Sequence, residues 1–139
     1  TTIAGVGLLT AVCFTLVIDD PTRFASSRQV GPYLGLVPKR SQSGEIDKAM
    51  RISKAVDPYT RQLLVQCAQS LMRSGVKDSE LRQWGVKLAD TDKTSMRRAT
   101  IAVARKLAVL MHRLLVTGES YQPFYEQNRK EAAAQHKAA

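Results

Sequence analysis

A long helical pattern near the C-terminal end, from about Thr94 to Val116, most constrains how this chain can fold. Apolar residues recur on almost every side of it, which predicts a helix buried around most of its circumference. Such a helix needs several neighbours, so we interpret it as the central helix of a bundle. The apolar positions are Ala99, Ile101, Val103, Leu107, Leu110, Met111, Leu114 and Leu115.

The polar residues of this helix form one narrow stripe. Arg98, Arg105 and His112 repeat every seven residues, with Lys106 and Arg113 beside them. We interpret the stripe as a solvated edge of the bundle, with a binding surface as the alternative. His112 is a candidate base, although the sequence offers it no partner.

Two helices are expected before the middle of the chain. The glycine turn Ala4-Gly5-Val6-Gly7 opens a helix that runs to about Ile18, where Asp19-Asp20-Pro21 ends it. Ser26 or Ser27 can then cap a short helix that reaches about Leu34, with Tyr33 and Leu34 packing inward.

Two further helices are expected before the central one. The first runs from Pro58, capped by Asp57, to about Arg73, with Gly75 ending it. The next starts at Asp78 or Ser79. Three of its apolar residues are expected to face the core: Leu81, Trp84 and Leu88.

The stretch around residues 36–53 has no sustained helical period, and Gly35 and Pro38 break the helix before it. We expect an irregular loop or a short hairpin there, with its turn near Ser43-Gly44-Glu45. The predicted fold is therefore all-α, a compact helical bundle. Residues 1–125 form its one domain and residues 126–139 a polar tail, either a loose helix or frayed.

Charge and cysteine content narrow the class of protein. A net charge of +9 and a pI near 9.9 favour a polyanionic partner, most often nucleic acid, over a charge excess that serves only solubility. Cys13 and Cys67 lie in apolar helical patterns without CxxC spacing. They predict reduced core residues rather than a zinc site or a disulfide, as in a cytoplasmic protein.

The uncharged run from Ile3 to Ile18 is not expected to be a signal peptide or a membrane span. It lacks a basic start, is short for a spanning helix and ends in Asp19-Asp20, so we expect no membrane partner. Because the chain begins at Thr1, we interpret it as a piece of a longer protein.

The segment from Tyr33 to Ser53 is the candidate functional site. Lys39, Arg40, Lys48 and Arg51 surround Ser41 and Ser43 there. Guanidinium and ammonium groups match the charge and the oxygens of a phosphate, and a serine among them could attack its phosphorus. Gly5 and Gly7 offer a second phosphate contact, because a glycine turn at a helix start exposes backbone N–H groups, as in a helix-hairpin-helix motif. A plain turn that packs two helices is the alternative.

Several longer motifs occur in a characteristic order: AGVGLLTA, DDPTRFASSRQVGPYLGLVPKRSQSG, RISKAVDPYTRQLLVQCA, ATIAVARKLAVLMHRLL and ESYQPF. Together they resemble the C-terminal domain of the IS110/IS116/IS902 family of insertion-sequence transposases, over nearly the whole chain to about Phe124. One departure is Val56-Asp57-Pro58, where the family often has Gly-Asn or Gly-Asp.

The resemblance implies a DNA recombinase whose nucleophile is a serine, here Ser43, with Ser41 as the second choice. It also implies an N-terminal RuvC-like domain that holds divalent metal (Mg), a structured guide RNA and a homo-oligomer; no cofactor or metal is expected in this chain. The alternative is a DNA-binding module of helix-hairpin-helix type without chemistry of its own. The candidate nucleic-acid contacts are Gly5, Gly7, Lys39, Arg40, Arg51, Lys54 and Arg61.

Overall fold

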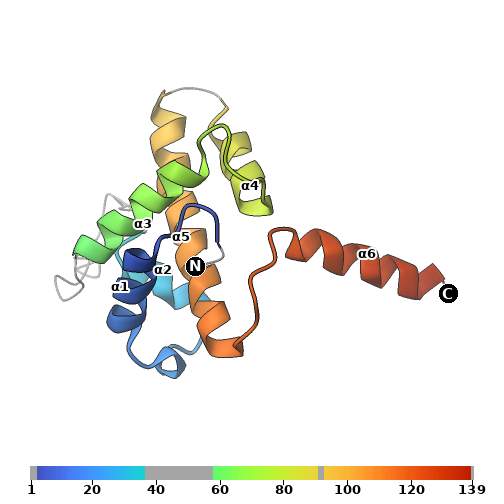
Figure 1. The fold of residues 1–139 in the computed structure, drawn as a ribbon, viewed down its shortest axis with the longest axis horizontal. Coiled ribbons are helices and arrows are strands. Elements are labelled where there is room, and N and C mark those ends of the chain that lie inside the picture. The colour runs from blue at the N-terminus through green and yellow to red at the C-terminus, as the bar shows by residue number, and fades with distance from the viewer. Residues whose placement is uncertain (1–2, 37–57, 91–92, 139) are drawn as a thin grey trace, which may run out of the picture.

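The computed structural model describes residues 3–36, 58–90 and 93–138, and every regular element within these ranges is helical (Figure 1). The all-α prediction is therefore confirmed. The elements are α1 (Leu8–Ile18), the 3-10 helices η1 (Pro21–Arg23) and η2 (Ser27–Gln29), α2 (Val30–Tyr33), α3 (Pro58–Leu71), α4 (Glu80–Leu88), α5 (Lys93–Thr117) and α6 (Tyr125–Ala138).

Helix α5 is the centre of the fold, as predicted. It contacts α3, α4 and α2, together with η1 and η2, and Figure 1 shows it running through the middle of the molecule. The neighbours cover only one side of α5, because Ile101 and Leu115 remain exposed. The prediction of burial around most of its circumference is therefore wrong. The fully buried apolar residues of α5 are Ala99, Val103, Ala104, Leu107 and Ala108.

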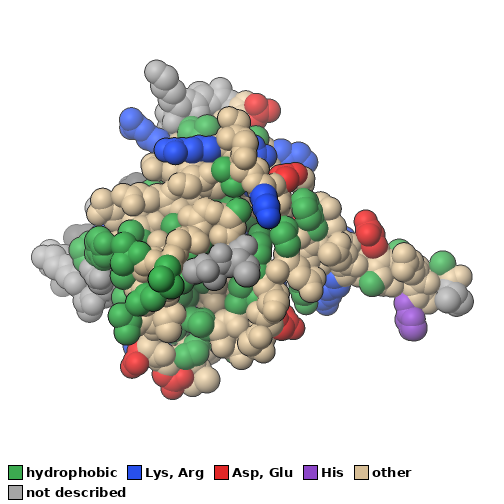
Figure 2. Space-filling model, viewed as in Figure 1, with side chains coloured by type: hydrophobic (Ala, Val, Ile, Leu, Met, Phe, Trp, Pro, Cys, Tyr) green, Lys and Arg blue, Asp and Glu red, His purple; other side chains and the backbone are tan. Residues whose placement is uncertain are grey.

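The first helix begins and ends where the sequence predicts. Gly7, in extended backbone, precedes α1, and after Ile18 the backbone turns at Asp19, whose N–H donates to the carbonyl of Thr15 at 3.0 Å. Three residues of α1 face the core: Thr10, Phe14 and Ile18. The opposite side carries no charge, and Figure 2 shows hydrophobic side chains gathered over this part of the molecule. The large exposed ones are Leu8, Leu9, Val12 and Leu16.

The segment after α1 is fixed by side-chain caps. Asp20 accepts hydrogen bonds from the backbone N–H and the hydroxyl of Thr22, at 2.9 and 2.7 Å. These hydrogen bonds lower the pKa of the Asp20 carboxyl below its ordinary value. Ser26 caps η2 by accepting from the Arg28 N–H at 3.2 Å, as the sequence predicts. Leu34 is buried and Tyr33 half-buried, which places both against the core.

Helices α3 and α4 also match their predicted starts. Pro58 is the first residue of α3, and the side chain of Ser79 accepts from the Arg82 N–H at 3.2 Å to cap α4. Trp84 packs against the core, but Leu88 is 46% exposed, so its predicted core position is wrong. Leu88 is the last residue of α4 and follows Gly85, at which a Cβ would lie 2.5 Å from Cγ2 of Val103 on α5.

The C-terminal segment is a helix, α6, which extends away from the other helices in Figure 1 and buries none of its residues. Its start is tied to α4, because the Glu80 carboxylate accepts from the N–H groups of Gln127 and Glu126, at 2.6 and 3.3 Å. Tyr121, just before α6, is partly buried and packed against the core. The division into residues 1–125 and 126–139 stays a prediction.

Candidate nucleic-acid interface

Most of the predicted site residues lie outside the described residues. Among them are both candidate nucleophiles, Ser43 and Ser41, and the whole expected loop or hairpin after Leu36. Four of the predicted nucleic-acid contacts also lie outside the described residues: Lys39, Arg40, Arg51 and Lys54. Their roles stay predictions, whereas Gly5, Gly7 and Arg61 can be placed.

The described residues on both sides of residues 37–57 are anchored in the core. On the N-terminal side, Leu36 is buried and its N–H donates to the carbonyl of Gly31 at 3.0 Å. Gly35 has a φ of 71°, a conformation that favours glycine and turns the chain out of α2. On the C-terminal side, Pro58 begins α3 and Thr60 is fully buried. The segment that contains Ser43 is therefore attached at both ends to ordered helices.

An arginine lies near each of these two anchors. Arg61 is half-buried in the first turn of α3, close in sequence to Pro58. Arg105 of α5 crosses α2 at Gly31, so closely that a Cβ on Gly31 would lie 2.8 Å from its Cγ. The carbonyl of the same Gly31 holds Leu36. Arg105 is therefore a candidate phosphate contact that sequence reasoning assigned to a solvated edge.

The glycine turn is only in part a candidate for phosphate binding. Gly5 has a φ of 83°, and a Cβ there would lie 3.2 Å from the carbonyl oxygen of Cys67 on α3. Close helix packing is thus sufficient reason for glycine at this position. Gly7 has open space around it, at the exposed start of α1. Of the two glycines, Gly7 is the better placed for a phosphate.

The polar stripe predicted on α5 is not a uniform solvated edge. Arg98 is exposed and Arg105 is half-buried, but His112 is only 2% exposed. The His112 ring lies 2.8 Å from the Ser27 hydroxyl through Nδ1 and 2.8 Å from the Pro21 carbonyl through Nε2. The prediction is therefore wrong at His112, which joins α5 to η1 and η2.

Near His112 lies an aromatic cluster that includes Tyr33. The Phe24 ring stands edge-on to both Tyr33 and His112, with centroid distances of 5.2 and 5.4 Å. Arg23 lies over the Tyr33 ring at 4.8 Å and donates to its hydroxyl at 2.7 Å. The ring and the hydroxyl of Tyr33 are therefore both engaged in packing contacts within the domain.

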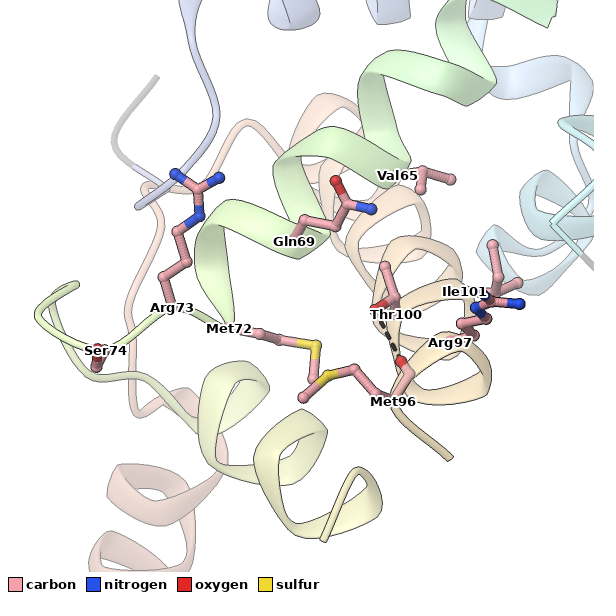
Figure 3. A pocket seen from close by; sticks show the side chains of 9 residues that line it. All are labelled: Val65, Gln69, Met72, Arg73, Ser74, Met96, Arg97, Thr100 and Ile101. Atoms are coloured by element: carbon pink, nitrogen blue, oxygen red, sulfur yellow. Dashed lines mark hydrogen bonds between the residues drawn. The ribbon is translucent and has the colours of Figure 1, made fainter. Parts of the chain in front are cut away.

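A groove of about 820 Å³ lies between the end of α3 and the first half of α5 (Figure 3). The side chains of Met72 and Met96 point toward one another across it, and Thr100 donates to the Met96 carbonyl at 2.8 Å. Arg73 and Arg97 also line this groove, so its lining combines apolar side chains with two cations. Methionine side chains adapt readily to different shapes.

The cysteines and acidic residues of the described ranges form neither a metal site nor a disulfide. Within residues 3–36, 58–90 and 93–138, no three His, Cys, Asp or Glu residues are grouped so as to hold a metal ion. Cys67 is buried, with its Sγ 3.4 Å from the Thr10 hydroxyl, and Cys13 is half-buried; neither forms a disulfide. No helix among the described residues is long and apolar enough to span a membrane.

The structure thus defines a basic, all-helical domain in which arginines border an anchored segment. The model of the family described as "Transposase IS116/IS110/IS902 family" matches residues 1–83, so the chain belongs to this transposase family.

Individual transposases support the assignment. The chain is 34% identical over 119 residues to "Transposase for insertion sequence element IS1111A" of Coxiella burnetii, covering 86% of this chain and 32% of that protein. It is 38% identical over 84 residues to "Transposase for insertion sequence element IS1328" of Yersinia enterocolitica, covering 60% of this chain and 25% of that protein. The chain therefore spans a third or less of these relatives. No solved structure matches it significantly.

Proposed function

We propose that this chain is the C-terminal DNA-binding and catalytic domain of an insertion-sequence transposase, with Ser43 as the nucleophile. The observation that carries the proposal is the family match over residues 1–83, which includes Ser43 and the basic residues around it. The anchoring of Leu36 and Pro58 adds support, because a nucleophile works best on a segment whose ends are held by rigid elements.

The chemistry that we propose is a transesterification at a DNA phosphodiester. The Ser43 hydroxyl loses its proton to a base and its oxygen attacks the phosphorus. The bond from phosphorus to one deoxyribose oxygen breaks, and that oxygen takes up a proton. The new phosphoserine diester keeps the bond energy, so a deoxyribose hydroxyl of another strand can attack it and regenerate Ser43 without ATP.

Cations are needed because the phosphate gains negative charge in the transition state. Arg40, Arg51, Lys54 and Arg61 remain our candidates from the sequence. The structure adds Arg105, because its side chain crosses α2 beside the carbonyl that holds Leu36. Arginine suits this role because its planar donors can bind two phosphate oxygens at once.

We further propose that the domain works with parts that this chain does not contain. These are an N-terminal RuvC-like domain of the same protein with its Mg ions, a structured guide RNA and other copies of the protein in a homo-oligomer. The full transposase would then provide the metal-dependent chemistry, and this domain the serine.

The alternative is a DNA-binding module of helix-hairpin-helix type that leaves the chemistry to other residues. The observation in its favour is the open space at Gly7 before α1, where backbone N–H groups could reach a phosphate. Against it, α1 carries no basic residue. The two functions differ in whether DNA becomes covalently attached to the domain.

The deciding experiment uses the full-length transposase that carries this chain. Recombination is stopped by denaturation, the protein is digested, and the peptide that carries a nucleotide is identified by mass spectrometry. We expect the nucleotide on Ser43 and none in the Ser43→Ala protein. An adduct on another residue, or none while recombination proceeds normally, would overturn the assignment.

A further inference from the structure

A second groove lies between α4, α5 and the start of α6, with Arg28 of η2 at its border; its volume is about 1250 Å³. It differs from the α3–α5 groove in Figure 3 and contains none of the predicted contacts around Ser43. The cations that line it are Arg28, Arg82, Lys87, Lys106, Arg113 and Lys130.

Two of these cations are positioned by aromatic rings. Lys106 Nζ lies 3.8 Å from the centroid of the Trp84 ring, and Arg113 Cζ lies 4.7 Å from that of Tyr125. Such contacts attract a cation to the face of the ring and restrict where it can move. Both cations belong to α5 and are seven residues apart, so they are separated by about 10 Å along the helix axis.

The Arg113 side chain is incompletely satisfied. Its Nε is buried and has no hydrogen-bond partner among the described residues. A buried N–H of a charged group without an acceptor is costly, so a ligand oxygen that reached it would be bound favourably. Burial and then the neighbouring Arg105 lower the pKa of the Lys106 ammonium group, so a bound anion would favour its charged form.

Two of the carboxylates that line the groove are already engaged. Asp78 accepts from the Gln83 amide at 2.6 Å and pairs with Arg82 at 3.5 Å. Glu80 caps the start of α6 through Gln127 and Glu126. Among the described residues, neither of these two carboxylates pairs with Arg28, Lys106 or Arg113, so neither neutralises the charge that the three cations offer to an external anion.

We propose that this groove binds the sugar–phosphate backbone of a nucleic-acid strand through Arg28, Lys106 and Arg113. One face of the Trp84 ring and one face of the Tyr125 ring each carry a cation, so those faces are not open to stack bases. Recognition is therefore of phosphates and independent of base sequence. The inference rests on the proposed function only in that the ligand is nucleic acid, and it does not involve Ser43.

The test measures binding of the 139-residue chain to fluorescein-labelled 20-nucleotide oligo(dT) and oligo(U) over a range of salt concentrations. The groove variant is Lys106→Gln with Arg113→Gln. Its control is Lys77→Gln with Lys137→Gln, which removes the same amount of charge. Both lysines are exposed and neither lines the groove. A preference for either oligonucleotide identifies the source of the strand.

We expect the groove variant to reduce the magnitude of the salt slope by about 1.4, because each single-strand phosphate contact contributes about 0.7. This corresponds to a roughly 10- to 30-fold loss of affinity at about 0.1 M salt. The control should lose less than about threefold. Equal losses of affinity in the two variants would overturn the proposal. So would a competition in which poly-glutamate displaces the labelled oligonucleotide as effectively as unlabelled oligonucleotide of equal charge.

Two further variants separate the possible explanations. Arg28→Gln tests the same groove without removing a contact with Trp84 or Tyr125, so misfolding around these rings cannot explain a loss of affinity in this variant. Unchanged affinity would show that Arg28 is not part of the site. The measurements are repeated with Ser43→Ala, which should bind the oligonucleotides normally. Failure of the groove and failure of the serine assignment are thus separate results.

Discussion

The hydroxyl of Ser27 lies 2.8 Å from Nδ1 of His112, a residue 85 positions later in the chain. The other ring nitrogen, Nε2, lies 2.8 Å from the carbonyl oxygen of Pro21, which can only accept. Nε2 therefore donates to this carbonyl, and in the neutral ring Nδ1 then accepts from the Ser27 hydroxyl. One buried ring thus joins α5 to both 3-10 helices and satisfies a polar group in each.

Replacing His112 should therefore destabilise the domain. His112→Phe removes both hydrogen bonds and leaves the Pro21 carbonyl without its donor, so we expect a loss of about 2 kcal/mol in the free energy of unfolding. Urea denaturation measures it. His136→Phe on the exposed α6 is the matched control and should change stability by less than about 0.5 kcal/mol. Equal effects at the two histidines would contradict this role of His112.

The close approach of α4 to α5 predicts a second stability effect. A Cβ on Gly85 would lie 2.5 Å from Cγ2 of Val103, a side chain that has little rotamer freedom in a helix. Although alanine is the better helix former, Gly85→Ala should cost about 1–2 kcal/mol in the free energy of unfolding.

The double variant separates overpacking from other effects. In a Val103→Ala background the contact is gone, so Gly85→Ala should be neutral or stabilising. The two changes should therefore be non-additive by at least about 1 kcal/mol when measured by urea denaturation. Additive losses would show that contact with Val103 is not why position 85 is glycine.

His112 also shows where sequence reasoning stops. The repeat of seven residues that links Arg98, Arg105 and His112 suggested one stripe. An α-helix turns by about 20° per heptad away from such a repeat, so the line drifts around the helix. It starts at exposed Arg98 and ends at buried His112, under η1 and η2. The partners of His112 come from distant sequence, which no local pattern reveals.

Helix starts and periods were predictable because their signals are local. The cap at Ser79, the first residue Pro58 and the end of α1 at Asp19-Asp20-Pro21 all depend on a few adjacent residues. Arg105 could not be assigned to the site in this way, because its position depends on its packing across Gly31. The aromatic positioning of Lys106 likewise depends on α4 lying beside α5.

The net charge of +9 predicts how binding should respond to salt. If the chain neutralises about five phosphates of duplex DNA, the logarithm of its affinity should fall with that of the salt concentration at a slope of about −4 to −5. Binding should also show little preference among DNA sequences. Fluorescence titrations between about 0.05 and 0.2 M salt measure both, and an affinity that stays constant over this range would refute the electrostatic explanation.

The sharpest prediction concerns the serines of the segment between Leu36 and Pro58. In the full-length transposase, Ser43→Ala should abolish strand exchange, because no other hydroxyl would then form the phosphoserine linkage. Ser41→Ala is the matched control: it removes the same group two residues away and should keep substantial activity. Ser43→Ala should still fold and bind DNA, because we expect the loss of this one hydroxyl to change stability little.

Arg40→Ala completes this set of variants and distinguishes charge stabilisation from nucleophilic attack. It keeps the Ser43 hydroxyl but removes a cation close to it in sequence, so the adduct should still form, about 10- to 1000-fold more slowly. Single-turnover cleavage of a labelled DNA substrate, with the adduct followed on denaturing gels, compares all three variants. Normal strand exchange by Ser43→Ala would move the nucleophile elsewhere, and loss of the adduct in Ser41→Ala alone would place it at Ser41.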